Sequence, residues 1–315
     1  MKILVIGDTH ARTKFLHEYY KLSESLNAIA DKLAPDKIIL LGDDLHNHSS
    51  VHSLQLKAVT DLILKLSQIA PVYKLIGNHE IISPNNFCEG DHHFHSLKSI
   101  DNITIIDNTL VEEGLLFVPY VPKGMFKEAV KHVDFSKINM CFAHQEFRGV
   151  IMGSNHESTS DDTYTVDLPP VISGHIHMKQ QINNIHYVGS PHQITFADAL
   201  DRYVALVDNG VIDYIKVEGI TQYKTFELDL KEDIPESLEY NKNDRNRLLV
   251  YGSLTDYKSF RSSKLFKKLS SDKFIIVPKV HNDKIEFKKS ERKTFQSAVN
   301  ELLTDDLKEI WKEIL

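Results

Sequence analysis

The sequence predicts an α/β protein in which a two-layer β-sandwich is flanked by helices and is followed by a small α+β lobe and terminal helices. Three observations support this fold class. Short apolar segments alternate with amphipathic ones in the first third of the chain, follow one another directly in the middle third, and begin a new pattern near residue 221. A chain of 315 residues, 42% of them hydrophobic, is long enough for one large domain and a smaller one.

The first third of the chain predicts parallel strands connected by helices. Apolar runs at residues 2–6, 37–41 and 72–76 have the length of buried strands, and apolar residues recur at helical spacing over residues 14–33 and 51–69. Because a strand–helix–strand connection joins parallel strands, these segments should form one parallel sheet.

Further strands are predicted between residues 103 and 217. The expected strands lie at residues 103–106, 115–118, 138–142, 171–173, 185–188, 203–207 and 211–217. The later strands are close together with no helix between them, so we expect them to pair antiparallel.

Charge and histidine content divide the chain into regions that we predict as residues 1–220, 221–290 and 291–315. Residues 1–215 contain 17 basic and 26 acidic residues, whereas residues 242–293 contain 15 basic and 6 acidic residues. Of the 17 histidines, 16 lie between His10 and His192. This contrast predicts a metal site in the first region and a polyanion-binding surface in the second.

The region after residue 221 predicts a β-α-β lobe and a helical end. Strands are expected at residues 223–228, 247–251 and 274–280, with a helix at 256–269. Residues 291–315 contain two apolar stripes at helical spacing, which indicate either a helical hairpin packed on its own domain or a face that binds a partner.

Composition excludes several classes of protein. No apolar run approaches the about 18–20 residues that span a membrane, and the apolar start of the chain is too short for a signal-peptide core. Cys88 and Cys141 are the only cysteines, which argues against a disulfide framework and against a thiolate zinc site. We therefore expect a reducing, cytoplasmic location, in the host cytoplasm if the source is a virus.

Five polar segments each follow a predicted strand. They are Gly7-Asp8-Thr9-His10, Gly42-Asp43-Asp44-Leu45-His46, Gly77-Asn78-His79-Glu80, Ala143-His144-Gln145 and Gly174-His175-Ile176-His177. Ligand sites in open α/β sheets lie beyond the carboxyl ends of the strands, so we expect these segments to meet at one place. The glycine before four of them lets the backbone turn sharply and approach a bound ion.

The side chains in these segments are suited to two divalent cations. Oxygen and imidazole ligands without thiolates suit manganese, iron or zinc, and the carboxylates and the amide favour manganese or iron. We expect manganese, with magnesium or iron as alternatives. The i, i+2 spacing of Asp8 and His10 directs both side chains to one side of an extended segment. Asp43 has two oxygens that can bridge ions about 3.5–4 Å apart.

In their residues and their order along the chain, these five motifs resemble those of the calcineurin-like metallophosphoesterase family. Within that family, they are similar to the motifs of the SbcD-type nuclease subunits of DNA repair and phage recombination complexes. Two features narrow the resemblance to this branch: His46 stands three residues after Asp43, and Gly189-Ser190-Pro191 follows a predicted strand. The match covers about residues 1–217. The lobe at 221–290 resembles the family's DNA-capping domain in pattern only.

The resemblance implies a role for each matching residue. One metal would be held by Asp8, His10, Asp43 and His177, and the second by Asp43, Asn78, His144 and His175. His79 would act as general acid or stabilise the transition state, and His46 would contact the phosphate. Asp44 departs from the family pattern, which has an apolar residue there, and it adds a negative charge near the expected phosphate position.

The function that the resemblance implies is that of a manganese-dependent DNA nuclease. It would act as a 3′-to-5′ exonuclease on duplex ends and as an endonuclease on single strands, through in-line attack by a hydroxide that bridges the metals. The expected partners are DNA at the nucleoid, an ABC-type (SbcC-like) ATPase subunit bound through residues 291–315, and a second copy of the chain.

Two other functions are compatible with the motifs. A phosphoprotein phosphatase or small-molecule phosphodiesterase of the same superfamily is one, although the phosphatase form GD-x-x-D-R-G is absent from the sequence. A non-catalytic scaffold with the same fold is the other, although such a scaffold would be expected to have lost metal ligands.

Outside the motifs, two sets of residues have less specific interpretations. A basic run at helical spacing, which could contact DNA phosphates or form an ordinary solvated helix face, consists of Arg261, Lys264, Lys267 and Lys268. The histidines that we expect to be solvated loop residues are His48, His52, His92, His93, His95, His156 and His192.

Overall fold

The computed structural model describes residues 1–48, 50–88, 90–153 and 156–281 and divides the chain into two units. The first unit contains residues 1–225 and 239–247, and the second contains residues 226–238 and the chain from residue 248 onward. The predicted partner-binding segment at residues 291–315 lies outside the described residues. In the described part of the chain, no helix is both long and apolar enough to cross a membrane.

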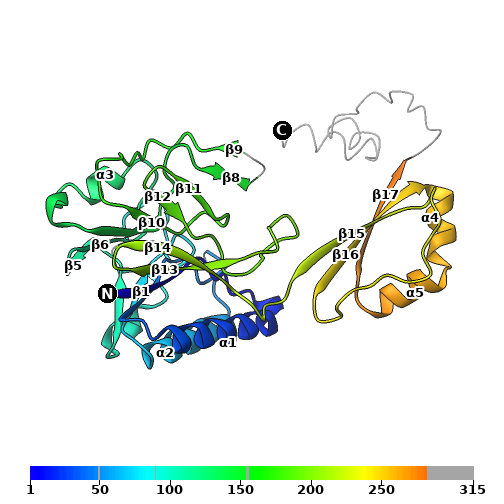
Figure 1. The fold of residues 1–315 in the computed structure, drawn as a ribbon, viewed down its shortest axis with the longest axis horizontal. Coiled ribbons are helices and arrows are strands. Elements are labelled where there is room, and N and C mark those ends of the chain that lie inside the picture. Colours follow the sequence, from blue (N-terminus) through cyan, green and yellow to red (C-terminus); the bar gives the residue numbers. More distant parts are fainter. Residues whose placement is uncertain (49, 89, 154–155, 282–315) are drawn as a thin grey trace, which may run out of the picture. The chain divides into compact units, whose positions relative to one another are not determined.

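The first sheet of the first unit has six strands in the order β14-β13-β1-β2-β3-β4. Its parallel strands are the three predicted, β1 (Lys2–Ile6), β2 (Lys37–Leu40) and β3 (Val72–Leu75), together with β4 (Ile103–Ile106), which was predicted as a strand without a place in this sheet. Antiparallel to β1 lies β13 (Tyr203–Asp208), which pairs with β14 (Val211–Lys216). The helices α1 (Leu16–Leu33), preceded by the 3₁₀ turn η1 (Thr13–Phe15), and α2 (Ser53–Ser67) cover one face of this sheet (Figure 1).

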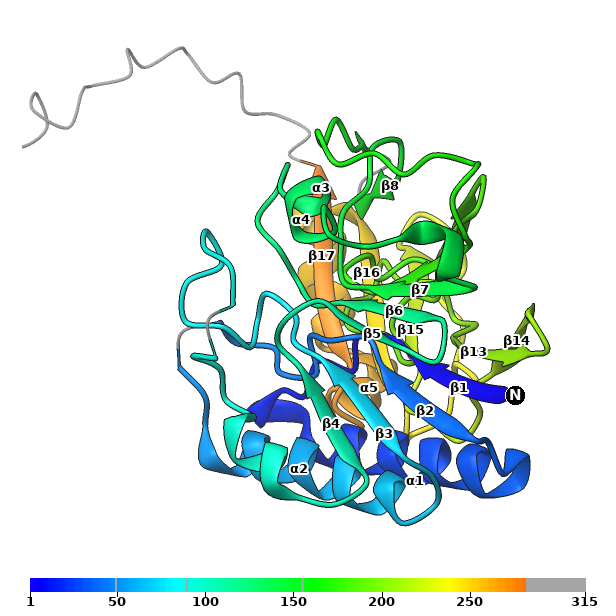
Figure 2. The same cartoon turned by 90° about the vertical axis from the view of Figure 1, so that its left-hand side faces the viewer.

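The second sheet has the order β11-β12-β10-β7-β6-β5 and packs on the opposite face of the first sheet (Figure 2). Its strands are β5 (Leu110–Glu112), β6 (Leu115–Val118), β7 (Met140–Ala143), β10 (Val171–Ser173), β11 (Gln180–Ile182) and β12 (Ile185–Tyr187). Together the two mixed sheets and their flanking helices form the α/β fold that the sequence predicted.

The antiparallel prediction is wrong for the centre of the second sheet, where β6, β7, β10 and β12 are parallel. Long connections at residues 119–139, 144–170 and 174–184 return the chain to the same end of the sheet without a full crossover helix. These connections contain only short elements: α3 (Phe126–Ala129), η3 (Phe135–Lys137), β8 (Ile151–Met152), β9 (His156–Glu157) and β11. The antiparallel prediction is confirmed for β13 and β14.

Alternating side chains in each sheet separate three layers of core. Along β1, Ile3 and Val5 point into the core between the sheets, whereas Leu4 and Ile6 pack against α1 and α2. In the second sheet, Phe117 and its neighbours in the same layer face the first sheet, while the alternate residues face the outer connections. Both faces of each sheet are therefore buried, which fixes the register of the strands that lead into the polar segments.

The second unit contains a three-stranded sheet with the order β15-β16-β17 and two helices. The strands are β15 (Tyr223–Asp229) and β16 (Arg245–Ser253), which both begin in the first unit, and β17 (Ile275–His281). The single helix predicted at residues 256–269 is wrong, because the chain forms α4 (Leu254–Arg261) and then α5 (Lys264–Ser271). The Ser263 hydroxyl accepts a hydrogen bond from the backbone N–H of Phe266 at 3.1 Å and so begins a new helix.

This break divides the predicted basic run between two helices. Arg261 ends α4, whereas Lys264, Lys267 and Lys268 belong to α5, where Leu265 and Leu269 form the buried side. All four basic side chains are exposed. The run therefore faces solvent, although it is not one continuous helical stripe.

Candidate metal centre

The polar segments occupy the carboxyl ends of five strands in the two sheets. Because β1, β2 and β3 are parallel to one another, and β7 is parallel to β10, the chain leaves each sheet at one edge. The side chains that follow these strands are Asp8 and His10 after β1, Asp43 after β2, Asn78 and His79 after β3, His144 after β7, and His175 and His177 after β10.

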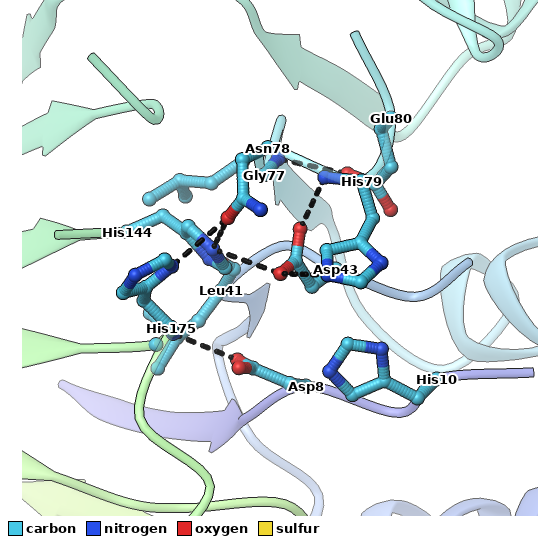
Figure 3. A network of polar contacts seen from close by, with 12 residues as sticks. Asp8, His10, Leu41, Asp43, Gly77, Asn78, His79, Glu80, His144 and His175 are labelled. Atoms are coloured by element: carbon cyan, nitrogen blue, oxygen red, sulfur yellow. Dashed lines mark hydrogen bonds and ion pairs between the residues drawn. The ribbon is translucent and has the colours of Figure 1, made fainter. Parts of the chain in front are cut away.

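Six of the seven predicted ligands form two compact groups of potential metal-binding atoms. One group is Asp8, His10 and His177, and the other is Asp43, His144 and His175; within each group the ligand atoms lie within 4.8 Å of one another. The seventh predicted ligand, Asn78, belongs with the second group, because its Oδ1 lies 3.2 Å from His144 Nε2 and 2.9 Å from His175 Nδ1 (Figure 3).

Two features of the first group would be unfavourable without a bound cation. Asp8 is fully buried, and its Oδ2 has no hydrogen-bond partner among the described residues. The Nε2 atoms of His10 and His177 face each other at 2.8 Å. A buried carboxylate oxygen without a donor is costly, and two imidazole nitrogens can both direct lone pairs at a shared cation. The donor set therefore fits a divalent metal.

Hydrogen bonds from the backbone orient the side chains of the second group. His144 Nδ1 donates to the Leu41 carbonyl at 2.8 Å, which leaves Nε2 directed at the site. Asp43 Oδ1 accepts from the backbone N–H of His79 at 2.9 Å, and Asp43 Oδ2 lies 3.3 Å from His144 Nε2 (Figure 3). Asp43 thus has one oxygen toward His144 and one held by the loop that carries His79.

His79 is fixed beside the two groups without belonging to either. Its Nδ1 donates to the His46 carbonyl at 2.6 Å, so its Nε2 is the nitrogen left for other contacts, 3.7 Å from Asp43 Oδ2. The His46 ring lies 5.5 Å from the His10 ring and 6.1 Å from the His79 ring. The structure therefore brings both predicted catalytic histidines next to the predicted metal ligands.

Backbone conformation at the centre is unusual. His10, Asp43 and His175 have φ values of 41°, 51° and 77°, in the left-handed region that non-glycine residues rarely adopt. Gly42, with φ of 112°, has no room for a side chain, because a Cβ there would lie 2.6 Å from His144 Nδ1. A Cβ on Gly77 would lie 2.2 Å from Asp43 Oδ1. These glycines therefore make room for the ligand side chains themselves.

Burial and neighbouring charges set the protonation of the ligands. Burial lowers the pKa of His175 and of His177 to about 4, so both imidazoles are neutral at pH 7. Burial raises the pKa of Asp8 to about 8. Burial alone would lower the pKa of His144, but the nearby Asp43 carboxylate outweighs it and raises this pKa to about 9.

These shifts predict that metal binding releases protons at neutral pH. Asp8 and His144 have pKa values above 7 in the metal-free protein, and both must lose a proton to bind a cation, so the apparent affinity for Mn²⁺ should rise from pH 6 to pH 9. Titration calorimetry at pH 7 in buffers of different ionisation enthalpy should detect the release of up to about two protons. An affinity that stays constant between pH 6 and pH 9 would contradict this assignment.

Asp44 is paired with a buried lysine next to the centre. Its side chain is buried, with Oδ2 2.8 Å from the Nζ of Lys74, and Lys74 also contacts Glu80 Oε2 at 2.7 Å. The Thr9 hydroxyl donates to Asp44 Oδ1 at 2.6 Å. We call Lys74, Asp44 and Glu80 the buried charge triad. The negative charge of Asp44 is therefore paired with a lysine, but Asp44 and Glu80 share that one lysine, so the ionised triad keeps one net negative charge.

Glu80 connects this triad to the loops of the metal centre. Its two carboxylate oxygens accept the backbone N–H groups of Asp44 at 2.8 Å and of Gly77 at 2.9 Å. Asp44 follows the ligand Asp43, and Gly77 precedes the ligand Asn78. The triad therefore holds together the loop after β2 and the loop after β3, which carry ligands of the candidate metal centre. The one signal for it in the sequence is a lysine within the buried strand β3.

The prediction of solvated loop histidines is wrong for two of the seven. His192 is buried and donates from Nε2 to the Thr9 carbonyl at 2.8 Å, and His92 is buried with Nε2 3.3 Å from Asp107 Oδ2. His48 is exposed, but its ring centroid lies 3.6 Å from that of His79, which adds a contact to the predicted catalytic group. These contacts join residues that are distant in the sequence, so no local sequence pattern predicts them.

The comparisons with known proteins agree on one family. The sequence model of the calcineurin-like phosphoesterase family matches residues 1–179. Protein 244L of Invertebrate iridescent virus 6 is 33% identical over 281 residues, covering 84% of this chain and 98% of that protein. Protein 078R of Invertebrate iridescent virus 3 is 30% identical over 294 residues, covering 89% of this chain and 84% of that protein. Both carry a provisional designation as phosphoesterases.

A more distant similarity extends to a phage protein. Exonuclease subunit 1 of Enterobacteria phage T4 is 22% identical over 216 residues, which cover 64% of this chain and 62% of that protein.

Proposed function

Because the chain belongs to the calcineurin-like phosphoesterase family and is a metal-dependent phosphoesterase, we propose that its substrate is DNA. In this proposal it is a manganese-dependent nuclease, a 3′-to-5′ exonuclease on duplex ends and an endonuclease on single strands. The similarity to exonuclease subunit 1 of phage T4 supports a nuclease over other phosphoesterases. The donor set of carboxylate, amide and imidazole groups supports manganese.

The observation that carries the choice of a phosphodiester is the position of His46. Its ring lies 5.5 Å from that of His10 and 6.1 Å from that of His79, so imidazoles extend beyond the two ligand groups. A phosphodiester carries an ester on both sides of the phosphorus and therefore needs contacts beyond the ion positions. His46 and His79 provide nitrogen donors for those contacts.

The described residues suggest how the chain would assist cleavage. Two bound cations would neutralise charge on the phosphate oxygens and activate the attacking water. His79 keeps its Nδ1 proton on the His46 carbonyl, so any proton that it gives to the departing oxygen must come from Nε2. Burial lowers the pKa of His79, so Nε2 takes up that proton most readily when an anionic phosphate lies beside it.

The second unit supports the choice of a polyanionic substrate. Residues 248–293 contain 12 basic and 5 acidic residues, and the side chains of Arg261 in α4 and of Lys264, Lys267 and Lys268 in α5 are exposed. We retain Arg261, Lys264, Lys267 and Lys268 as proposed contacts to DNA phosphates. The ABC-type ATPase subunit and the homodimer remain proposals from the resemblance, since residues 291–315 lie outside the described part of the chain.

Cleavage assays on matched substrates test this function. Purified protein is stripped of metal, reloaded with Mn²⁺, and incubated with end-labelled duplex DNA, circular single-stranded DNA and a chromogenic phosphomonoester. We expect cleavage of both DNA substrates, shortening of the duplex from its 3′ ends, little phosphomonoester hydrolysis, and loss of all activity with a chelator. Preferential hydrolysis of the phosphomonoester would instead support a phosphatase. No turnover of any substrate by protein that binds two metal equivalents would support a scaffold.

A further inference from the structure

A second polar site lies in the first unit, in a pocket of about 420 Å³. Its lining combines three arginines with aromatic side chains from separate parts of the chain. These are Arg12 and Phe15 before α1, Phe196 in the loop before β13, Tyr223 in β15, and Arg245 and Arg247 in β16. The residues that line this pocket include no carboxylate.

Aromatic rings hold the three guanidinium groups in place. The Cζ atoms of Arg245 and Arg12 lie 3.8 Å and 4.7 Å from the centroid of the Phe15 ring. Arg247 Cζ lies 4.5 Å from the centroid of the Phe196 ring. A guanidinium stacked on an aromatic face keeps its N–H groups in a fixed plane, which prepares it to bind an anion through two parallel hydrogen bonds.

The charge of the arginines is only partly balanced. Glu18 is buried, and its carboxylate lies 3.9 Å from Arg12 Nη2 and 3.8 Å from Arg245 Nε. Glu18 also accepts the Tyr223 hydroxyl at 2.6 Å, and that hydroxyl accepts from Arg12 at 2.6 Å and from Arg245 at 3.1 Å. Glu18 thus orients two of the three cations. Asp198 is a second carboxylate beside the pocket, because its Oδ2 accepts the backbone N–H groups of the lining residues Ile194 and Thr195. Three arginines and two carboxylates leave one positive charge in excess.

Most N–H groups of these arginines remain available. A guanidinium group has five N–H donors. Among the described residues, Arg12 donates two hydrogen bonds, to the Ile194 carbonyl and to the Tyr223 hydroxyl, and Arg245 donates one, to Tyr223. Arg247 bonds only to the Thr225 hydroxyl. The pocket therefore has unused, fixed donors and excess positive charge, which together favour a phosphate.

The loops that form this pocket also form the metal centre. Arg12 follows the ligand His10 by two residues, so their Cα atoms are at most about 7 Å apart. On the other side, His192 donates to the carbonyl of Thr9, and Ile194, two residues later, accepts from Arg12 at 2.6 Å. The pocket is thus anchored on both sides of the segment that carries Asp8 and His10.

We propose that this arginine pocket binds the phosphate of a nucleotide next to the scissile phosphodiester. This inference rests on the proposed function, because it requires a substrate with at least two phosphates. One DNA strand carries a phosphate about every 3.4 Å along the helix axis, so a phosphate next to the one at the metal centre falls close to the segment that carries Arg12. The pocket would favour a polynucleotide over a small diester that has no second phosphate.

Kinetics on substrates of different length test the pocket. The substrates are an oligothymidylate, a thymidine dinucleotide with one phosphodiester, and bis(p-nitrophenyl) phosphate, all assayed with Mn²⁺. Wild-type protein should show a higher kcat/KM for the oligonucleotide than for the two substrates with one phosphate. In the variants Arg245→Gln and Arg247→Gln this preference should fall by at least about tenfold, mainly through KM. The slope of log affinity against log salt should decrease by about 1 for each arginine removed.

A matched control and a binding assay separate the possible failures. Lys216 pairs with Asp201 on the exposed surface of the first unit, and Lys216→Gln removes the same charge away from the pocket, so it should leave the preference unchanged. Fluorescence anisotropy of labelled oligothymidylate with metal-free protein should show the same order of affinities. If wild-type protein cleaves DNA and the arginine variants keep the full preference, the pocket assignment is wrong while the nuclease function stands. If wild-type protein neither binds nor cleaves DNA, both are wrong.

Discussion

Replacement of His79 by alanine is expected to lower kcat for metal-dependent phosphodiester cleavage by about 10²–10⁴-fold while leaving the metal content near that of the wild type. His79 lies outside both groups of ligand atoms, although its Nε2 is 3.7 Å from Asp43 Oδ2. Its removal therefore takes away the proposed proton donor and phosphate contact without removing a member of either group. Single-turnover cleavage assays and metal analysis of the same samples measure the two effects separately.

The control for this variant is another histidine in the same unit. His156 is exposed in β9 and belongs to neither ligand group, so His156→Ala should have wild-type kcat and metal content. Cleavage by His79→Ala within about twofold of the wild type would refute the catalytic role of His79. Loss of metal together with activity would show that His79 acts as a ligand or supports one.

A second large effect is expected from Lys74→Met, which should reduce the free energy of unfolding by about 3–5 kcal/mol. Lys74 is fully buried, and its ammonium group contacts the buried carboxylates of Asp44 and Glu80 at 2.8 Å and 2.7 Å. Methionine fills a similar volume but leaves two carboxylates in the interior without their counter-charge. Urea unfolding of the metal-free protein, followed by a signal from the first unit, measures the loss.

The double variant Asp44→Leu/Lys74→Met is the matched control for this prediction. It removes one positive and one negative charge, and Glu80 keeps the backbone donors of residue 44 and Gly77. Because the double variant leaves one unpaired buried carboxylate, Glu80, where Lys74→Met leaves two, it should recover part of the stability lost in Lys74→Met. If the double variant is as unstable as the single one, the loss does not come from the unpaired charge of Asp44.

The parts of the fold that the sequence predicted are those with local signals. Strands β1, β2 and β3 are short apolar runs, and their alternating side chains fill two different cores, so pattern and packing agree. The candidate ligands could be located for the same reason, because each lies shortly after a short apolar strand, either β1, β2 or β3 in the first sheet or β7 or β10 in the second. Once the strands within each sheet run parallel, their direction alone places the seven polar side chains at the same edge.

What the sequence did not predict depends on contacts between distant segments. The parallel pairing of β6, β7 and β10 requires connections that have no regular pattern of their own. The pairing of Lys74 with Asp44 joins β3 to the loop after β2, and the arginine pocket joins β16 to the loop after β1. The helix break at Ser263 is a local feature that the sequence analysis missed. Ser263 caps α5, but it lies among basic residues at helical spacing, which predicted one continuous helix.

The positive φ angles of His10, Asp43 and His175 have a consequence for protein engineering. A designer who grafts the seven ligand side chains onto an ordinary strand-to-loop scaffold would reproduce the chemistry of the donors but not the direction of these three. Each has to be transplanted with its own loop, including Gly42 before Asp43, because only that backbone turns the donor inward. The transferable unit of this enzyme is thus a set of bent peptide segments, and a graft that copies side chains alone would aim three donors away from the ions.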